Sequence, residues 1–114
     1  MTAASTTTRC YNLGPLRQVP PGEGRVFRVG RSSVAVFRAR DGKAYATQAL
    51  CPHRAGPLAD GIIGAGKVVC PLHGEKFDLV TGQSLGNRCP PLEIYPALVD
   101  DGGDIIVSLP NHQR

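Results

Sequence analysis

Two short stretches near the middle of the chain determine how the rest of it is interpreted. Residues 51–61 read CPHRAGPLADG, and residues 70–82 read CPLHGEKFDLVTG. Each stretch opens with cysteine and proline and has a histidine close behind, so the pattern is C-x-H followed by C-x2-H. With four cysteines and three histidines in 114 residues, both pairs arise by chance only about once in a hundred sequences. The pattern therefore predicts a metal site whose ligands are Cys51, His53, Cys70 and His73.

Two kinds of metal centre use these residue types. Structural zinc sites usually draw on a pair of cysteines two to four residues apart, or on a pair of histidines. Here each short pair mixes one thiolate with one imidazole, and one pair has a single intervening residue. A [2Fe–2S] centre in which two thiolates hold one iron and two imidazoles hold the other explains this mixing. The spacing favours such a cluster, and a zinc-stabilised binding module without a redox role is the alternative.

Outside these stretches, the chain has the pattern of short strands separated by turns. The sequence contains 14 glycines and 10 prolines, and no segment shows a sustained helical period. Asp41-Gly42 is a strong hairpin signal. In the C-terminal part, Ile105, Val107 and Leu109 alternate with polar residues, as in a half-buried strand. We expect an all-β chain of antiparallel sheets, with strands at 25–29, 33–40, 43–50, 68–69, 94–99 and 105–109. A further strand segment, which ends at Thr81-Gly82, carries Phe77 and Leu79 on one face.

The length is that of one domain with one core. We expect residues 1–7 to be a flexible tail, residues 8–110 to form the domain, with a metal-binding lobe at about 50–75, and residues 111–114 to be a polar tail. No apolar run approaches the ~18 residues that cross a bilayer, and the N-terminus has no apolar signal segment. We therefore expect a cytoplasmic protein that does not interact with membranes. Structural disulfides are not expected in that compartment.

The formal charge is +4 and the isoelectric point is about 9.1. The excess comes largely from five arginines of the predicted strand region, which form either a solvated face or a docking surface for an acidic partner. The chain has only six aromatic residues, three Phe and three Tyr, and no nucleic-acid-binding module, so no nucleic-acid partner is expected. The arginines are Arg25, Arg28, Arg31, Arg38 and Arg40.

The two quoted stretches resemble the cluster-binding loops of the Rieske family, and the resemblance extends from about Cys10 to Pro110. It implies a Rieske fold of antiparallel sheets that carries a small cluster-binding lobe formed by two loops. It also implies one [2Fe–2S] cluster, with the two cysteines on a buried iron and the two histidines on an outer iron at an exposed tip. Pro90 and Pro91 fall where the family places a third loop beside the cluster, although an ordinary turn explains them equally well.

At several positions this chain differs from one branch of the family and is more similar to another branch. High-potential Rieske proteins of respiratory complexes carry an extra cysteine in each loop, whereas this chain has Leu72 in one loop and Gly56-Pro57 in the other. The positions where that branch places Ser and Tyr hydroxyls are occupied by Glu75 and Phe77. The chain thus resembles the soluble, low-potential ferredoxins. The motifs assign no role to Cys10 and Cys89, and we expect each to be a small buried residue or a surface thiol.

The resemblance implies a one-electron carrier with no catalytic residues of its own. One expectation is a ferredoxin that links a flavoprotein reductase to a terminal oxygenase; the alternative is the small subunit of an NAD(P)H-dependent nitrite reductase. If His53 and His73 lie at the tip, Arg54 and Lys76 add positive charge there, and we expect an acidic partner surface. The sequence does not identify the donor, the acceptor or the oligomeric state.

Overall fold

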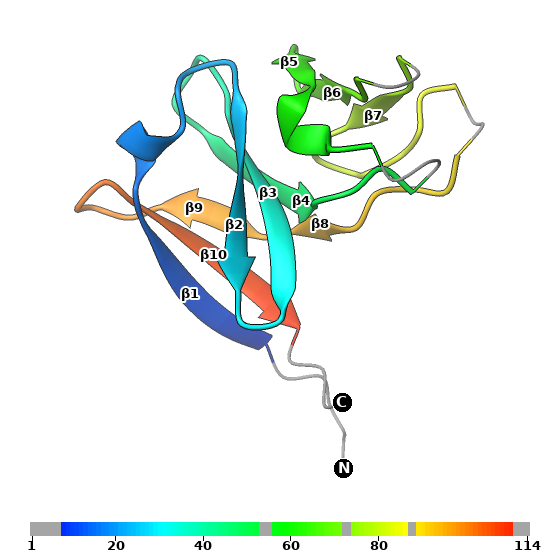
Figure 1. The fold of residues 1–114 in the computed structure, drawn as a ribbon. Coiled ribbons are helices and arrows are strands. Elements are labelled where there is room, and N and C mark those ends of the chain that lie inside the picture. Colours follow the sequence, from blue (N-terminus) through cyan, green and yellow to red (C-terminus); the bar gives the residue numbers. More distant parts are fainter. Residues whose placement is uncertain (1–7, 53–55, 72–73, 87–88, 111–114) are drawn as a thin grey trace.

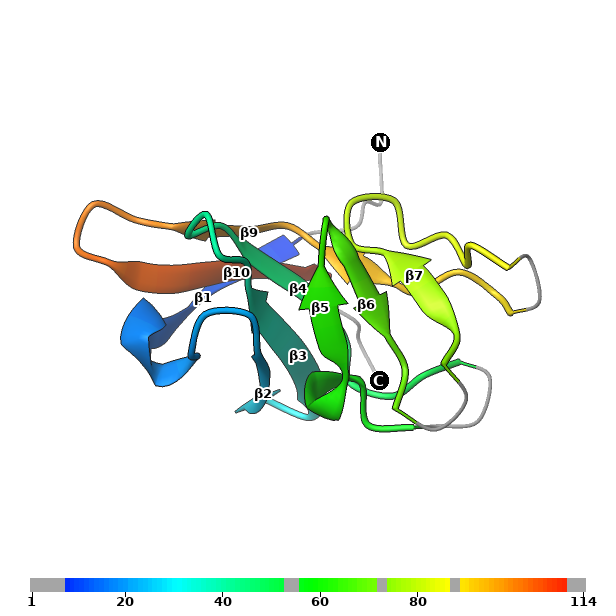
Figure 2. The same ribbon diagram turned by 90° about the horizontal axis from the view of Figure 1, so that it is seen from above.

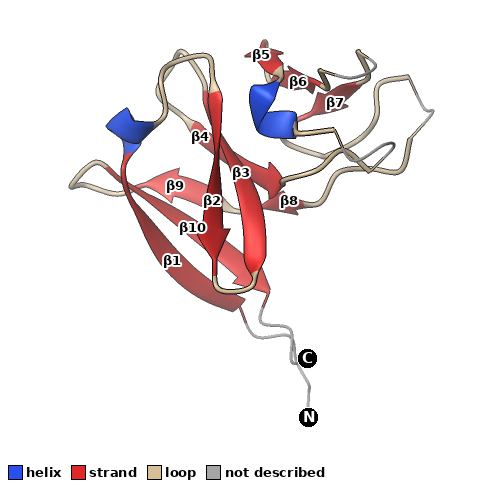
Figure 3. Cartoon of the chain, in the orientation of Figure 1, coloured by secondary structure: helices blue, strands red, loops and turns tan. Residues whose placement is uncertain are grey.

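The structure is a computed structural model in which residues 8–52, 56–71, 74–86 and 89–110 are described (Figures 1 and 3). These residues form three antiparallel sheets and two single turns of 3-10 helix, η1 (Leu16–Gln18) and η2 (Leu58–Asp60). Among the described residues, no helix is long and apolar enough to cross a membrane. The expectation of an all-β chain built from antiparallel sheets is confirmed.

The central sheet has four strands in the order β2-β3-β4-β8. Its longest strands form two hairpins, of which the one at Asp41-Gly42 was predicted. Gly30 and Gly42 adopt the positive φ that tight turns between strands need (60° and 93°). The middle strand β3 is the most apolar, with four consecutive residues, 34–37, fully buried. The strands are β2 (Gly24–Val29), β3 (Ser32–Arg38), β4 (Ala44–Gln48) and β8 (Ile94–Tyr95).

A second sheet packs against one face of the central sheet and is ordered β1-β10-β9. Its strands are β1 (Thr8–Pro15), β9 (Ala97–Val99) and β10 (Asp104–Pro110). The alternating residues Ile105, Val107 and Leu109 are all buried, as their period of two predicts. They share a core with the buried valines and alanines of the central sheet, and this core forms the base of the molecule.

The third sheet forms a separate lobe and has the order β5-β6-β7. Figure 2 shows that these short strands lie to one side of the central sheet. Helix η2 connects the lobe to the base by packing against β2 and β3. Phe77, Leu58 and Val68 from the lobe join Phe37 of the base in one buried cluster, which we call the lobe core. The strands are β5 (Ile62–Gly64), β6 (Lys67–Val69) and β7 (Lys76–Asp78).

Two local features differ from the sequence-based expectations. The single strand expected at 94–99 is divided at Pro96, whose missing N–H interrupts the ladder, so that β8 joins one sheet and β9 the other. Strands β1 and β5 were not predicted. The apolar pattern of β1 is broken by a bulge at Asn12–Gly14, where the register with β10 shifts. The expected tails, residues 1–7 and 111–114, lie outside the described residues.

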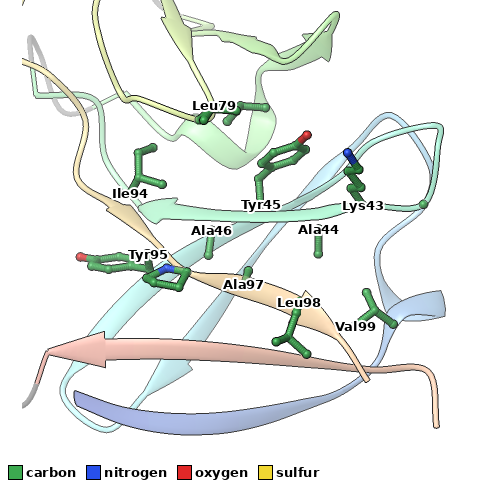
Figure 4. A pocket seen from close by; sticks show the side chains of 13 residues that line it. Lys43, Ala44, Tyr45, Ala46, Leu79, Ile94, Tyr95, Ala97, Leu98 and Val99 are labelled. Atoms are coloured by element: carbon green, nitrogen blue, oxygen red, sulfur yellow. The ribbon is translucent and has the colours of Figure 1, made fainter. Parts of the chain in front are cut away.

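A groove of about 570 Å³ opens where the two base sheets separate. Figure 4 shows it between β4, the β8–β9 segment and Leu79 of the lobe. Tyr45 and Tyr95 both line it and are half-buried. Tyr45 packs against the lobe core, while Tyr95 packs against the core of the base. Both tyrosines therefore pack at the edge of a core.

Gly82 connects the lobe to the segment that returns to the base. Its φ is +83°, and its carbonyl oxygen accepts a hydrogen bond from the Leu92 amide at 2.7 Å. A Cβ atom at this position would lie 2.3 Å from the Leu92 carbonyl oxygen, which is closer than real Cβ contacts come. The position therefore requires glycine for two reasons, the backbone conformation and the space.

We predict that Gly82→Ala destabilises the protein much more than Gly42→Ala. Both residues have positive φ, but a Cβ at Gly42 would meet no atom within 4 Å. Gly42→Ala should therefore carry only the conformational penalty of about 1 kcal/mol, whereas Gly82→Ala adds backbone overlap and should cost at least about 2 kcal/mol more. Thermal unfolding followed by circular dichroism measures both variants. Equal midpoints for the two would contradict this role of Gly82.

Candidate metal centre

Cys51 and Cys70 lie just beyond the ends of two strands in different sheets. Cys51 follows β4 of the central sheet, and Cys70 follows β6 of the lobe. The two residues are only 2% and 0% exposed, and both belong to the lobe core. The fold therefore brings the two predicted sulfur ligands, 19 residues apart in sequence, into the same buried cluster.

The two loops that follow these cysteines are closed in the same way. The Cys51 amide donates a hydrogen bond to the Gly56 carbonyl oxygen, and the Cys70 amide donates to the Glu75 carbonyl oxygen, both at 2.8 Å. One residue outside each bond, the chain pairs as an antiparallel ladder, Leu50 with Pro57 and Val69 with Lys76. The loops 51–56 and 70–75 are therefore equal in length, although their Cys–His spacings differ. The similarity of the two motifs in sequence therefore corresponds to the same backbone closure in the structure.

The two histidines of the motifs, His53 and His73, lie outside the described residues, as do Arg54 and Leu72. Each falls within one of the two closed loops in sequence. Among the described residues there is no group of three or more potential metal-ligating side chains. The structure therefore locates the two predicted cysteine ligands and leaves the two predicted histidine ligands untested.

Glycines in and beside the loops serve different purposes. Gly56 is buried at the closure of the first loop, and Gly74 has a φ of +72° in the second. Gly61 is needed for packing, because a Cβ there would lie 2.2 Å from the Val69 carbonyl oxygen. Its role is therefore in the turn and in the close approach of η2 to β6.

A buried polar pair supports the second loop. The Ser84 hydroxyl donates a hydrogen bond to the Glu75 carboxylate, and both residues are less than a tenth exposed. Ser84 also pairs with Phe77 as an isolated bridge, and Phe77 is fully buried. Sequence reasoning singled out Glu75 and Phe77 but missed Ser84, because no motif marks a serine nine residues beyond its partner.

The segment 89–92 packs against the lobe core from the other side. Leu92 is buried within it, and the half-buried Cys89 contacts it. Pro90 and Pro91 are exposed between them. This arrangement supports the interpretation of residues 90–91 as part of a third loop beside the two cysteine loops. Cys10, in contrast, is an exposed thiol on β1 whose sulfur lies 3.4 Å from the Ser108 hydroxyl.

The chemistry of this site suits iron bound through sulfur. Thiolates are soft ligands that iron–sulfur clusters and zinc both accept, and their burial limits water access. Two buried cysteines supplied by two separate loops match the half of a Rieske centre in which a single iron is held by two thiolates. The described residues thus fit the group that the sequence predicts.

The family model of the Rieske [2Fe-2S] domain matches residues 9–96 of this chain. The match covers most of the chain and includes all four predicted ligand positions. The chain therefore belongs to the Rieske [2Fe–2S] domain family.

The similar proteins include a dioxygenase ferredoxin subunit and a nitrite reductase small subunit. The 3-phenylpropionate/cinnamic acid dioxygenase ferredoxin subunit of Escherichia coli K12 is 36% identical over 101 residues, which cover 87% of this chain and 92% of that protein. Among solved structures, a Mycobacterium tuberculosis protein assigned as the small subunit of an NADH-dependent nitrite reductase is similar with a TM-score of 0.83. It is 26% identical, and the match covers 90% of this chain and 96% of the other.

A third similar structure comes from an assembly. One chain in a complex of reduced oxygenase and oxidised ferredoxin from carbazole 1,9a-dioxygenase matches with a TM-score of 0.76 and 28% identity. The match covers 92% of this chain and 97% of that one. Both kinds of relative named by the sequence analysis are therefore found among the similar proteins.

Asp78 organises the turn that follows the second loop. Its carboxylate accepts hydrogen bonds from the amides of Val80 (2.7 Å) and Thr81 (3.0 Å). These bonds, first that from Thr81, lower the pKa of the carboxyl below its usual value of 3.8, and nearby Lys67 acts in the same direction. Because the folded-state pKa is lowered, the stabilisation is present above about pH 4 and is lost as the pH falls through the folded pKa.

We predict that Asp78→Ala lowers the free energy of unfolding by about 1 kcal/mol at pH 7, because two turn amides lose their acceptor. Asp78→Asn keeps an acceptor oxygen but has no charge, so it should lose less at pH 7. The difference in free energy of unfolding between Asp78→Asn and the unmodified protein should vanish as the pH falls below the lowered pKa of Asp78. Denaturant titrations at pH 7 and at decreasing pH test this, and a difference independent of pH would contradict it.

Proposed function

We propose that this protein is an electron carrier that binds one Rieske-type [2Fe–2S] cluster through Cys51, Cys70, His53 and His73. The observation that carries the proposal is the convergence of two buried cysteines, on loops of equal length, in one core. Family membership supports the same ligand set. When bound, such a cluster supplies one-electron redox chemistry.

In this proposal the two halves of the site have different tasks. Cys51 and Cys70 hold one iron inside the lobe core, where burial keeps water away from the thiolates. His53 and His73, each within a closed loop in sequence, hold the other iron. The prolines that follow the cysteines, Pro52 and Pro71, restrict the backbone beside each thiolate and help to fix both loops. We propose that residues 8–110 form the single domain that carries this site.

The partners that we favour are those of a ring-hydroxylating dioxygenase system. The curated relatives are ferredoxin components or subunits of such systems, and they align with this chain over most of their length. In this role the protein takes electrons from a flavoprotein reductase in the cytoplasm and gives them to a terminal oxygenase. The exposed Lys76 on β7 lies directly after the second loop, so positive charge stands near the point where a partner would dock.

A second role has specific structural support. The TM-score is 0.83 for the nitrite reductase small subunit and 0.76 for the chain from the carbazole dioxygenase complex. The sequence identity favours the other role, because it is 26% with the nitrite reductase small subunit and 36% with the dioxygenase ferredoxin subunit. In that role the protein would join a large flavin- and sirohaem-bearing subunit. The neighbouring genes distinguish the two, because an oxygenase α-subunit and a sirohaem reductase point to different partners.

The ligand assignment predicts the effect of single cysteine changes. Cys51→Ser and Cys70→Ser should each abolish the visible absorption of the cluster and the bound iron and sulfide, because a hydroxyl is a poor soft ligand. His53→Ala and His73→Ala should also lose the cluster or leave an unstable remnant. The measurements are the absorption spectrum and the iron and sulfide content of purified protein.

Cys10→Ser is the matched control, because it makes the same change at an exposed thiol on β1. It should leave the spectrum unchanged. If Cys51→Ser or Cys70→Ser keeps the full spectrum, the assignment is wrong. Colourless unmodified protein that contains zinc instead of iron would favour the zinc-stabilised binding module.

The surroundings of the second loop predict a low reduction potential. Phe77 offers no hydroxyl, and Glu75 brings a buried carboxyl to the loop that carries Cys70. The midpoint should lie near the lower end of the Rieske range, about −150 mV rather than +300 mV. Phe77→Tyr and Glu75→Ser should each raise it, as measured by voltammetry on the loaded protein. A midpoint well above zero in the unmodified protein would be incompatible with this prediction.

A further inference from the structure

The described charges are distributed unevenly along the molecule. Asp100, Asp101 and Asp104 cluster at the turn between β9 and β10, with the first two exposed. Figures 1 and 2 both place this turn at the opposite end of the molecule from the loops that carry Cys51 and Cys70. The turn between β9 and β10 is therefore acidic, although the exposed Arg17 lies beside it, and this turn is far from the proposed cluster.

Positive charge lies at the turn between β2 and β3. Arg28 near the end of β2 and Arg31 in the turn are both exposed. The ladder pairs Arg28 with Ser33, and the next pair along β3 joins Val34 to both Phe27 and Gln48. Gln48 is the last residue of β4, which leads into the first cysteine loop. The β2–β3 turn therefore lies at the same end of the central sheet as the exit of β4 towards Cys51.

Exposed apolar side chains accompany these arginines. Val26 is 50% exposed, and it lies on the same face of β2 as Arg28 because side chains alternate along a strand. Val26 pairs with Ala35, which belongs to the lobe core, so this is the face of the sheet on which the lobe packs. Leu50, directly before Cys51, is 51% exposed. Apolar contacts bordered by arginines are typical of surfaces that bind other proteins.

Neither arginine is neutralised within the part of the chain that the structure describes. The ion pair found there joins Arg25 to Glu23 at 3.2 Å, at the other end of β2. Arg28 and Arg31 take part in no ion pair with a described residue. An acidic surface from another molecule would therefore meet two positive charges that have no competing acid in the described chain.

We propose that Arg28 and Arg31, together with Val26 and Leu50, form a docking surface for the acidic face of the protein partner that exchanges electrons at the cluster loops. We call it the basic hairpin surface. The proposal rests on the proposed function, because it assumes a redox partner at these loops. The charge distribution supports it, since an acidic partner attracts this surface and repels the Asp100–Asp101 turn, which turns the cluster end towards the partner.

The test uses cluster-loaded protein and a fluorescently labelled peptide of ten glutamates as an acidic probe. Arg28→Glu combined with Arg31→Glu should weaken peptide binding by about fivefold or more, measured by fluorescence anisotropy at low salt. In the unmodified protein, the amide NMR signals of residues 26–33 should shift when the peptide is added.

The matched control combines Arg17→Glu with Arg40→Glu, which makes the same change in net charge at exposed positions elsewhere. Arg17 lies in η1 beside the acidic turn, where the Leu16 amide bonds to the Gly103 carbonyl oxygen. Arg40 lies at the opposite end of the central sheet from the β2–β3 turn. This control should weaken binding by less than about twofold.

Equal weakening by both double variants would overturn the proposal, because only net charge would then matter. Binding of a ten-residue oligothymidylate as tight as that of the peptide would also overturn it, in favour of a nucleic-acid surface. Failure of the proposed function shows itself separately, as unmodified protein without the visible spectrum of an iron–sulfur cluster. Peptide binding that depends on Arg28 and Arg31, in protein that shows this spectrum, supports the proposal.

Discussion

The structure of the metal-binding end depends on two backbone hydrogen bonds, from the Cys51 amide to Gly56 and from the Cys70 amide to Glu75. Each bond closes a loop at its first residue, so the loop closure fixes the main chain of the cysteine, while its side chain packs in the lobe core. Because one loop leaves the central sheet and the other belongs to the lobe, both sulfurs can occupy one core only if the lobe is held firmly on the base. Much of the remaining architecture meets that requirement.

Three kinds of contact hold the lobe in place. Helix η2 packs its buried Leu58 and Ala59 against β2 and β3, and Gly24 leaves room for this approach, since a Cβ there would lie 3.1 Å from the Ala59 carbonyl oxygen. Gly82 and Leu92 join the lobe to the returning chain. Phe77, Phe37 and both cysteines share one buried cluster. The lobe is thus attached by packing on one side and by the chain itself on the other.

Much of this could be predicted from the sequence, for identifiable reasons. The hairpin turn at Gly42 and the alternation in β10 depend on local chemistry, which a single sequence shows directly. The two cysteine motifs are equally explicit, because ligand residues must appear at short spacing. Three features were not predicted: the division at Pro96, the bulge in β1 and the Glu75–Ser84 pair. Each depends on which distant strand or side chain lies opposite, and the spacing of residues in the sequence does not identify such contacts.

The pairing of β1 with β10 has a consequence for how this domain can be joined to other polypeptides. Thr8 lies opposite Pro110, so the chain enters and leaves the domain at the same edge of the second sheet. Figure 1 places that edge well away from the lobe. A linker, purification tag or neighbouring domain attached at either position would therefore leave the cysteine loops open to a docking protein. The fold thus behaves as a module that can be inserted or tethered without rebuilding its metal site.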